Sequence, residues 1–420
     1  MSNIERNWAG NYRYAASELL EPDSPEQVRE AVARSERVKV LGTRHSFNGI
    51  ADTSGTLISL RGLNRVIGLD RVNRRVTVEG GIRYGELGRY LHERGYALHN
   101  LASLPHISVA GAIATATHGS GDRNGNLSTA VHALDIVKAD GETISFSRDG
   151  SDGEIAGAIV GLGALGVVTR VTLNVIPTFE MSQTVYEGLS LSRLEKHFDD
   201  VFALGYSVSL FTNWRSSSFN QVWVKRRSED GESGWEERSL HGAVRAASKL
   251  HPVPGLAADP CSEQLGIPGP WYDRMPHFRL AFTPSAGDEL QSEYFVPRSR
   301  AYEALCAIDG LKEALSPLLY TSEIRTIAAD DLWMSPCYDR HSVGIHFTWK
   351  PDPAAVERAL PLIEEKLEPF GARPHWGKAF AMPPEKLRPM YEKLPEFRAL
   401  LSKCDPRGKF RNDFLDRYIP

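Results

Sequence analysis

The sequence has few cysteines, no long apolar run and no block of one charge. Its 4 cysteines are scattered over 420 residues, at Cys261, Cys306, Cys337 and Cys404. This scatter fits neither a disulfide framework nor a zinc site. No stretch of ~18 apolar residues occurs, which argues against a transmembrane helix, and the polar start lacks the apolar core of a secretory signal. These absences predict a cytoplasmic protein.

The charge and motif content exclude further classes. The net charge is −4 and no long basic run occurs, so we expect no nucleic-acid partner and no anionic membrane surface. The spacing of His341 and His346 suits no helix face and has no matching carboxylate, so we expect no metal. A serine hydrolase is not expected either, because the G-x-S-x-G motif is missing.

The chain is too long for one ordinary core, and we expect two or three packed units of α+β class. Residues 1–178 mix short strands and helices without a regular βαβ alternation. Residues 179–400 are predicted to form an antiparallel sheet backed by helices. The tail, 401–420, is polar but not of low complexity.

One glycine-rich segment matches the residue pattern of a dinucleotide-binding motif. Residues 161–166 read GLGALG, which matches G-x-G-x-x-G. That motif requires a helix directly after it, so that the helix N-terminus meets the pyrophosphate. Residues 167–172 read VVTRVT and favour a strand instead, which argues against a Rossmann site.

Two other segments of the first unit suit a phosphate-bearing ligand better. The loop from Gly42 to Ser46 follows a short apolar strand that ends at Leu41, and its glycine allows backbone N–H groups to approach phosphate. Alone, this loop is more typical of an ordinary turn with an exposed His45. The segment from Ser103 to Gly121 is rich in small, hydroxyl and histidine residues. It suits diphosphate binding by backbone dipoles, although a tightly packed helix of small residues has the same composition.

The second unit gathers polar side chains on predicted strands. Because side chains alternate along a strand, His346 and Thr348 share one face, as do Glu323 and Arg325. If the two strands are neighbours, all four side chains lie together, although a solvated sheet face has the same pattern. Lys378 follows a turn with Trp376 as a bulky anchor, and its charge either enters a pocket or is exposed.

Taken together, these segments resemble the vanillyl-alcohol-oxidase type of FAD enzymes, and among them the bacterial alditol oxidases. The resemblance spans nearly the whole chain and rests on the order of its pieces. These are residues 7–11 (NWAGN), 42–48 (GTRHSFN), 103–111 (SLPHISVAG), 117–121 (THGSG), 323–326 (EIRT), 346–349 (HFTW), 373–378 (RPHWGK) and 405–410 (DPRGKF).

The resemblance implies a two-subdomain FAD-binding domain over residues 1–178, a substrate domain over 179–400, and a return of 401–420 to the FAD-binding domain. It also implies a single covalent bond between the flavin 8α-methyl group and His45, because no counterpart of a second, cysteinyl link is evident. The implied FAD-binding residues are Leu41, Gly42, Thr43, Arg44, His45, Ser46, Ser103, Ser108, Gly111, Thr115, Thr117, His118 and Val168.

The implied reaction is oxidation of the terminal primary alcohol of a small polyol, such as xylitol, sorbitol or glycerol, with O2 reduced to H2O2. Lys378, Arg325 and His346 are the expected catalytic residues, with Lys378 accepting the hydroxyl proton. Glu323 is expected to balance Arg325. The expected substrate-binding residues are Ser103, Glu323, Arg325, His346, Thr348 and Lys378.

Two alternatives remain at the level of sequence. A sugar-1,4-lactone oxidase or dehydrogenase shares the His45 segment and the turn before Lys378, and a catalytically inactive FAD-binding protein would share the fold. The pairing of residues 323–325 with 346–348 favours alditols. Ala102 is expected beside the flavin, where side-chain bulk controls O2 access. We expect a monomer.

Overall fold

The described residues of the first part of the chain form two small sheets of three and five strands, a two-stranded pair of β6 with β10, and short helices. The computed structural model describes residues 6–150, 153–228, 239–283 and 285–420. A parallel three-stranded sheet has the order β1-β3-β2, and an antiparallel five-stranded sheet has the order β4-β5-β9-β7-β8. The elements are β1 (Glu18–Leu20), α1 (Pro25–Arg34), β2 (Val38–Leu41), β3 (Thr56–Ser59), β4 (Val66–Asp70), β5 (Arg75–Glu79), α2 (Tyr84–His92), β6 (Tyr96–Ala97), α3 (Val109–Ala114), β7 (Val131–Val137), β8 (Thr143–Ser147), α4 (Ile155–Ile159), β9 (Val167–Asn174) and β10 (Ile176–Pro177).

Local signals explain these elements. α1 begins where Ser24 accepts a hydrogen bond from the Gln27 backbone N–H and Pro25 occupies the first turn. The glycine-rich segment at 161–166 runs straight into β9, so the sequence argument against a Rossmann motif is confirmed.

The second part is dominated by one large antiparallel sheet. Within the described residues it has ten strands, in the order β14-β15-β11-β13-β12-β18-β19-β17-β20, with β16 paired to β11. The strands are β11 (Glu180–Ser190), β12 (Ser207–Thr212), β13 (Ser218–Arg227), β14 (Ser239–Leu240), β15 (Ala243–Arg245), β16 (Gly269–Pro270), β17 (Leu290–Pro297), β18 (Leu319–Ile327), β19 (Ser342–Trp349) and β20 (Arg373–Pro374).

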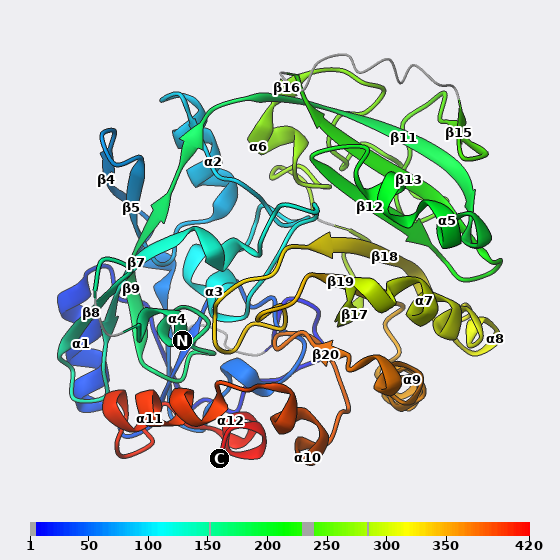
Figure 1. Cartoon of the computed structure of the whole chain (residues 1–420). Helices are drawn as coiled ribbons and strands as arrows, with labels where there is room; N and C mark the ends of the chain where they lie inside the picture. Colours follow the sequence, from blue (N-terminus) through cyan, green and yellow to red (C-terminus); the bar gives the residue numbers. More distant parts are fainter. Residues whose placement is uncertain (1–5, 151–152, 229–238, 284) are drawn as a thin grey trace.

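Helices cover one face of this sheet (Figure 1). Ile324, Ile345 and Phe347 point into a core that also contains buried residues of α5, α7 and α9. The predicted antiparallel sheet backed by helices is therefore confirmed. The remaining helices are α5 (Leu191–Phe202), α6 (Trp271–Arg274), α7 (Ala301–Asp309), α8 (Lys312–Leu315), α9 (Pro353–Leu367), α10 (Pro384–Leu387), α11 (Leu394–Cys404) and α12 (Asp413–Tyr418).

The C-terminal helices return to the first part of the chain, beside its N-terminal segments (Figure 1). α11 contacts α4, and α12 contacts the 3-10 turn Gly49–Ala51. The predicted boundary near residue 178 falls between β10 and β11, but the one at 400 falls inside α11. The division into domains thus stays a prediction, with the return starting before residue 401. Among the described residues, no helix combines the length and apolar character needed to cross a membrane.

Candidate functional site

A single large cavity brings the predicted residues together. It has a volume of about 1760 Å³, counting solvent space at its mouth, and residues from both parts of the chain line it. All predicted cofactor residues line it: Leu41, Gly42, Thr43, Arg44, His45, Ser46, Ser103, Ser108, Gly111, Thr115, Thr117, His118 and Val168. The predicted substrate residues Glu323, Arg325, His346, Thr348 and Lys378 line it too. Their individual roles stay predictions.

The loop that carries His45 is fixed to the second part of the chain. The Phe47 N–H donates to the Gly377 carbonyl at 2.8 Å, and the Asn48 amide donates to the carbonyls of Trp376 at 2.9 Å and Lys378 at 2.8 Å. The Trp376 ring is buried, as expected for an anchor. These contacts hold the His45 loop and the Lys378 turn as one wall of the cavity.

The His45 ring is neutral and partly buried, and its Nε2 is inaccessible to solvent. It lies 4.5 Å from the Trp8 ring between centroids, and its Nε2 has no hydrogen-bond partner among the described residues. Burial, with the charges of Lys378 and His106, lowers the pKa of His45 to about 3. A neutral imidazole in a cavity keeps a lone pair that is available for bonding.

Close backbone approach shapes the adjoining wall. A Cβ atom on Gly42 would lie 2.9 Å from the Ser108 Oγ, and one on Gly111 would lie 3.0 Å from it. Ser108 directly precedes α3, and its buried Oγ has no partner among the described residues. The loop after β2 and the start of α3 therefore present backbone and one unsatisfied hydroxyl to the cavity.

These walls fit FAD. A flat ring system with a diphosphate needs backbone donors, small side chains and close approach, and the two walls supply all three. Gly161, Leu162, Gly163, Leu165 and Gly166 also line the cavity. Sequence reasoning rejected this segment as a Rossmann motif and overlooked its place in the cavity wall.

The opposite wall of the cavity is formed by one face of the large sheet. β18 and β19 are neighbours, so the predicted gathering of polar side chains is confirmed. Glu323 lies opposite His346, and His346 lies opposite Glu293 on β17. In the next row Gln291 lies opposite Thr348. Sequence reasoning missed Glu293 and Gln291, although alternation along residues 290–297 places both on one face.

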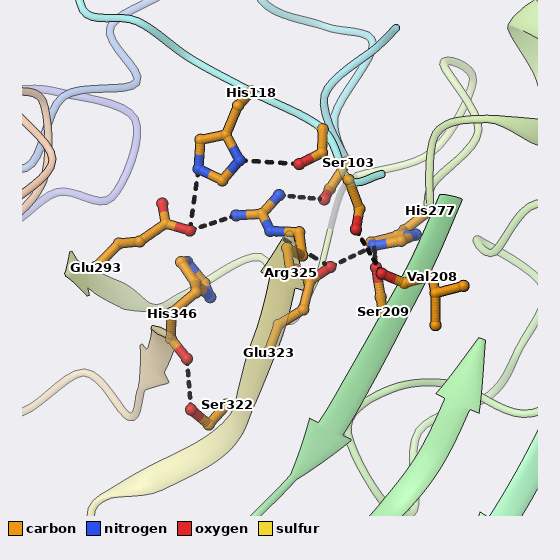
Figure 2. Close-up of polar contacts among 12 residues, drawn as sticks. Ser103, His118, Val208, Ser209, His277, Glu293, Ser322, Glu323, Arg325 and His346 are labelled. Atoms are coloured by element: carbon orange, nitrogen blue, oxygen red, sulfur yellow. Dashed lines mark hydrogen bonds and ion pairs between the residues drawn. The ribbon is translucent and has the colours of Figure 1, made fainter. Parts of the chain in front are cut away.

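Glu293 is the centre of a buried ion-pair cluster (Figure 2). Its Oε2 accepts from the Lys378 Nζ at 2.7 Å, and its Oε1 accepts from the Arg325 guanidinium at 2.6 Å. The His118 Nε2 lies 3.1 Å from the same Oε1. Burial alone would raise the pKa of Glu293, but Lys378 and Arg325 hold it well below its usual range. Glu293 is therefore a permanent carboxylate.

This arrangement bears on the expected roles of Lys378 and Glu323. Burial lowers the pKa of Lys378, and Glu293 opposes that shift. The pairing with a carboxylate favours a charged Lys378 that donates hydrogen bonds, and its expected role as proton acceptor stays a prediction. Glu323 was expected to balance Arg325, and its Oε1 lies 3.6 Å from the Arg325 Nε; Glu293 makes the shorter contact with the same guanidinium.

Glu323 also has a second partner. His277 donates from Nε2 to the Glu323 Oε1 at 2.7 Å (Figure 2). The Lys225 Nζ lies 3.2 Å from the His277 Nδ1. Burial lowers the pKa of His277 to about 4, so the ring is neutral. Ser103 accepts from Arg325 at 3.2 Å. The cluster thus orients two carboxylates and two cations toward one space.

One group outside the cavity has metal-ligand chemistry. Ligand atoms of His197, Asp200 and His241 lie within 4.8 Å of one another. The two imidazole rings are stacked, with centroids 4.0 Å apart and planes at 19°. Ring-nitrogen lone pairs lie in the ring plane, so stacked rings do not direct them at one ion, and we assign no metal here.

Comparison with known proteins agrees with this geometry. Residues 16–147 match the family described as "FAD binding domain", and residues 288–418 match "D-arabinono-1,4-lactone oxidase". The chain is 46% identical to an alditol oxidase of Streptomyces sp., over 99% of both chains. It is 31% identical to an L-gulono-1,4-lactone dehydrogenase of Mycobacterium tuberculosis, over the full length of both.

Solved structures agree on the fold. Cholesterol oxidase from B. sterolicum superposes with a TM-score of 0.78 at 15% identity, covering 99% of this chain and 96% of that one. The chain therefore belongs to the vanillyl-alcohol-oxidase family of FAD-dependent oxidoreductases.

Proposed function

We propose that the protein oxidises the terminal primary alcohol of alditols, such as xylitol, sorbitol and glycerol, to the corresponding aldose, with O2 as the final acceptor. The observation that carries the proposal is the Glu293 cluster, which presents Lys378 and Arg325 to the same cavity that His45 lines. The 46% identity to an alditol oxidase over nearly the whole chain supports the choice of substrate.

The side chains suit an uncharged ligand with many hydroxyl groups. Lys378 and Arg325 are donors, Glu323 is an acceptor, and Ser103 and Thr348 do both. Because each cation is paired with a carboxylate, the site offers hydrogen bonds without a net charge that would select an acidic sugar. The successive hydroxyl groups of a polyol can form hydrogen bonds with these side chains.

The reacting hydroxyl belongs beside the two cations. Bound FAD supplies a two-electron acceptor for the hydride of C1, and its reoxidation by O2 gives H2O2. Lys378 and Arg325 donate hydrogen bonds to the hydroxyl oxygen and stabilise the negative charge that develops there. Both donors are already oriented by Glu293, so little reorganisation is needed when that charge appears.

We also propose a single covalent bond between FAD and a ring nitrogen of His45. The neutral ring of His45, whose Nε2 is buried without a hydrogen-bond partner among the described residues, supports it, since such a ring carries a free lone pair. No cysteine is among the described residues that line the cavity, which agrees with one link only. A monomeric, cytoplasmic enzyme remains our expectation.

A substrate panel tests the proposal. Anaerobic flavin reduction is followed by absorbance with xylitol, sorbitol, glycerol, L-gulono-1,4-lactone and D-arabinono-1,4-lactone. We expect xylitol or sorbitol to reduce the flavin fastest and to release stoichiometric H2O2 in air. The lactone alternative is favoured by the family match over residues 288–418, and faster reduction by a lactone would establish it instead. Failure of every compound would point to an inactive FAD-binding protein.

A further inference from the structure

A buried chain of hydrogen bonds ends on His346. The His346 Nε2 lies 3.2 Å from the Gln291 Oε1, and the Gln291 Nε2 donates to the Glu289 Oε1 at 2.6 Å. The Ala286 backbone N–H donates to the other oxygen of Glu289 at 3.0 Å. All three side chains are buried, and Glu289 is not among the residues that line the cavity.

While Glu289 is ionised, the chain of bonds allows only one arrangement of protons; burial raises the pKa of Glu289, and the hydrogen bonds that it accepts from Ala286 and Gln291 oppose this shift. A carboxylate is an acceptor only, so Glu289 requires the NH2 group of Gln291 to face it. The amide oxygen of Gln291 therefore faces His346, and the His346 Nε2 must carry a hydrogen. A neutral imidazole has one N–H, so Nδ1 is bare. Burial, followed by the charge of Lys378, lowers the pKa of His346 well below its usual value, and the ring is neutral.

The bare nitrogen adds a neutral, unpaired acceptor to a site whose two carboxylates, Glu293 and Glu323, are already paired with Lys378, Arg325 and His277. The His346 Nδ1 is buried and has no hydrogen-bond partner among the described residues. Lys378 and Arg325 are protonated, and both are paired with Glu293. A hydroxyl that loses a hydride from its carbon must also give up its proton, and neither cation has a lone pair to take it.

We propose that Gln291, held by Glu289, is a positioning residue that fixes His346 in the Nε2–H tautomer and leaves Nδ1 to accept the hydroxyl proton of the substrate. The inference rests on the proposed function and names the group that accepts the hydroxyl proton of the substrate. The O–H bond breaks and an N–H bond forms at Nδ1, while the C1–H electron pair leaves as hydride to the flavin. The imidazolium formed is flanked by Glu293 and Glu323, which offset Lys378 and Arg325.

The tautomer is measured directly by nuclear magnetic resonance. A long-range proton–nitrogen correlation spectrum of FAD-loaded protein labelled with ¹⁵N-histidine separates protonated from bare ring nitrogens. The His346 signals are assigned by their loss in His346→Asn. We expect a protonated Nε2 and a bare Nδ1 without substrate. A protonated Nδ1 in the wild type would overturn the proposal, whatever the enzyme oxidises.

Two variants test the positioning role. Gln291→Leu removes the amide, and Glu289→Gln removes the carboxylate that orients it without altering the cavity wall. We expect both to give mixed His346 tautomers and to slow flavin reduction by xylitol on the order of tenfold or more, since a general base contributes about 10²–10⁴-fold. If Gln291→Leu fails to fold, Glu289→Gln still tests the positioning role.

Gln183→Leu is the matched control. Gln183 is fully buried on β11 of the same sheet and is not among the residues lining the cavity. It should leave the His346 tautomer and the reduction rate unchanged. Wild-type rates in both test variants, or an equal loss in the control, would overturn the positioning role. A wild-type protein that xylitol does not reduce would instead defeat the proposed function, while the spectrum still decides the tautomer.

Discussion

Glu293→Gln removes the charge that holds the catalytic cations while preserving the shape of the side chain. Lys378 and Arg325 both contact this carboxylate, at 2.7 and 2.6 Å, and its side chain is fully buried. Removing one partner of a buried ion pair costs about 3–5 kcal/mol. With about 2.1 cal/mol/K of unfolding entropy per residue, 420 residues give about 0.9 kcal/mol/K, so the melting temperature should fall by about 3–6 °C.

The assay is thermal unfolding of FAD-loaded protein, with Glu364→Gln as the control. Glu364 accepts from neutral donors only, the Tyr294 hydroxyl and the Ala381 N–H, so the control should stay within about 1 °C of the wild type. An unchanged melting temperature for Glu293→Gln would refute the central role of this carboxylate.

The same variant makes a prediction about pH. Without Glu293, burial and Arg325 lower the pKa of Lys378 unopposed by its nearest carboxylate, and a larger fraction of Lys378 is neutral near neutral pH. Lowering the pH restores the ammonium, so flavin reduction by Glu293→Gln should speed up as the pH falls. A rate that instead falls together with the pH would contradict this account of Lys378.

Three shorter predictions follow from the same geometry. His45→Ala should leave FAD, if bound, extractable by acid, whereas wild-type flavin should stay in the acid precipitate; retention by the variant would refute the link at His45. Because burial holds the pKa of His346 well below 6.5, the wild-type rate of flavin reduction should stay flat from neutral pH down to 6.5 and be lost only below it, as Nδ1 becomes protonated; a midpoint near 6.5 would contradict a buried neutral ring. Gly344→Ala should slow reduction and lower the melting temperature, because the new Cβ would lie 3.1 Å from the Glu293 Oε1; unchanged kinetics would show that the cluster has room to move.

The sequence predicted the parts of the site that depend on local pattern. Alternation along residues 342–349 placed His346 and Thr348 on one face, and β19 has that face toward the cavity. The motif order identified the His45 loop and the Lys378 turn. It could not show that Asn48 ties these two segments together, because that contact joins residues 330 positions apart.

The part that local pattern missed is the pairing across strands. Glu293, His346 and Glu323 form one row only because β17 and β18 flank β19 in a particular register. Nothing within residues 290–297 indicates which strand lies beside them, so local pattern offered no reason to distinguish Glu293 from any other polar residue of a strand. His277 was missed for the same reason, since it reaches Glu323 from a segment without regular structure.

The charge balance of the site limits the substrates more sharply than its shape. Lys378 and Arg325 are matched by Glu293 and Glu323, and His118, His277 and His346 are held neutral by burial. An aldonic acid would bring a carboxylate with no cation free to receive it, and burial of an unpaired charge is costly. Alditols and lactones are both uncharged, so charge alone does not separate them. Both classes react at a hydroxyl group that must lose its proton and whose oxygen needs donors to stabilise it. The two classes therefore differ in where that hydroxyl lies along the molecule, on the end of an open chain or on a ring, and the substrate panel measures this difference.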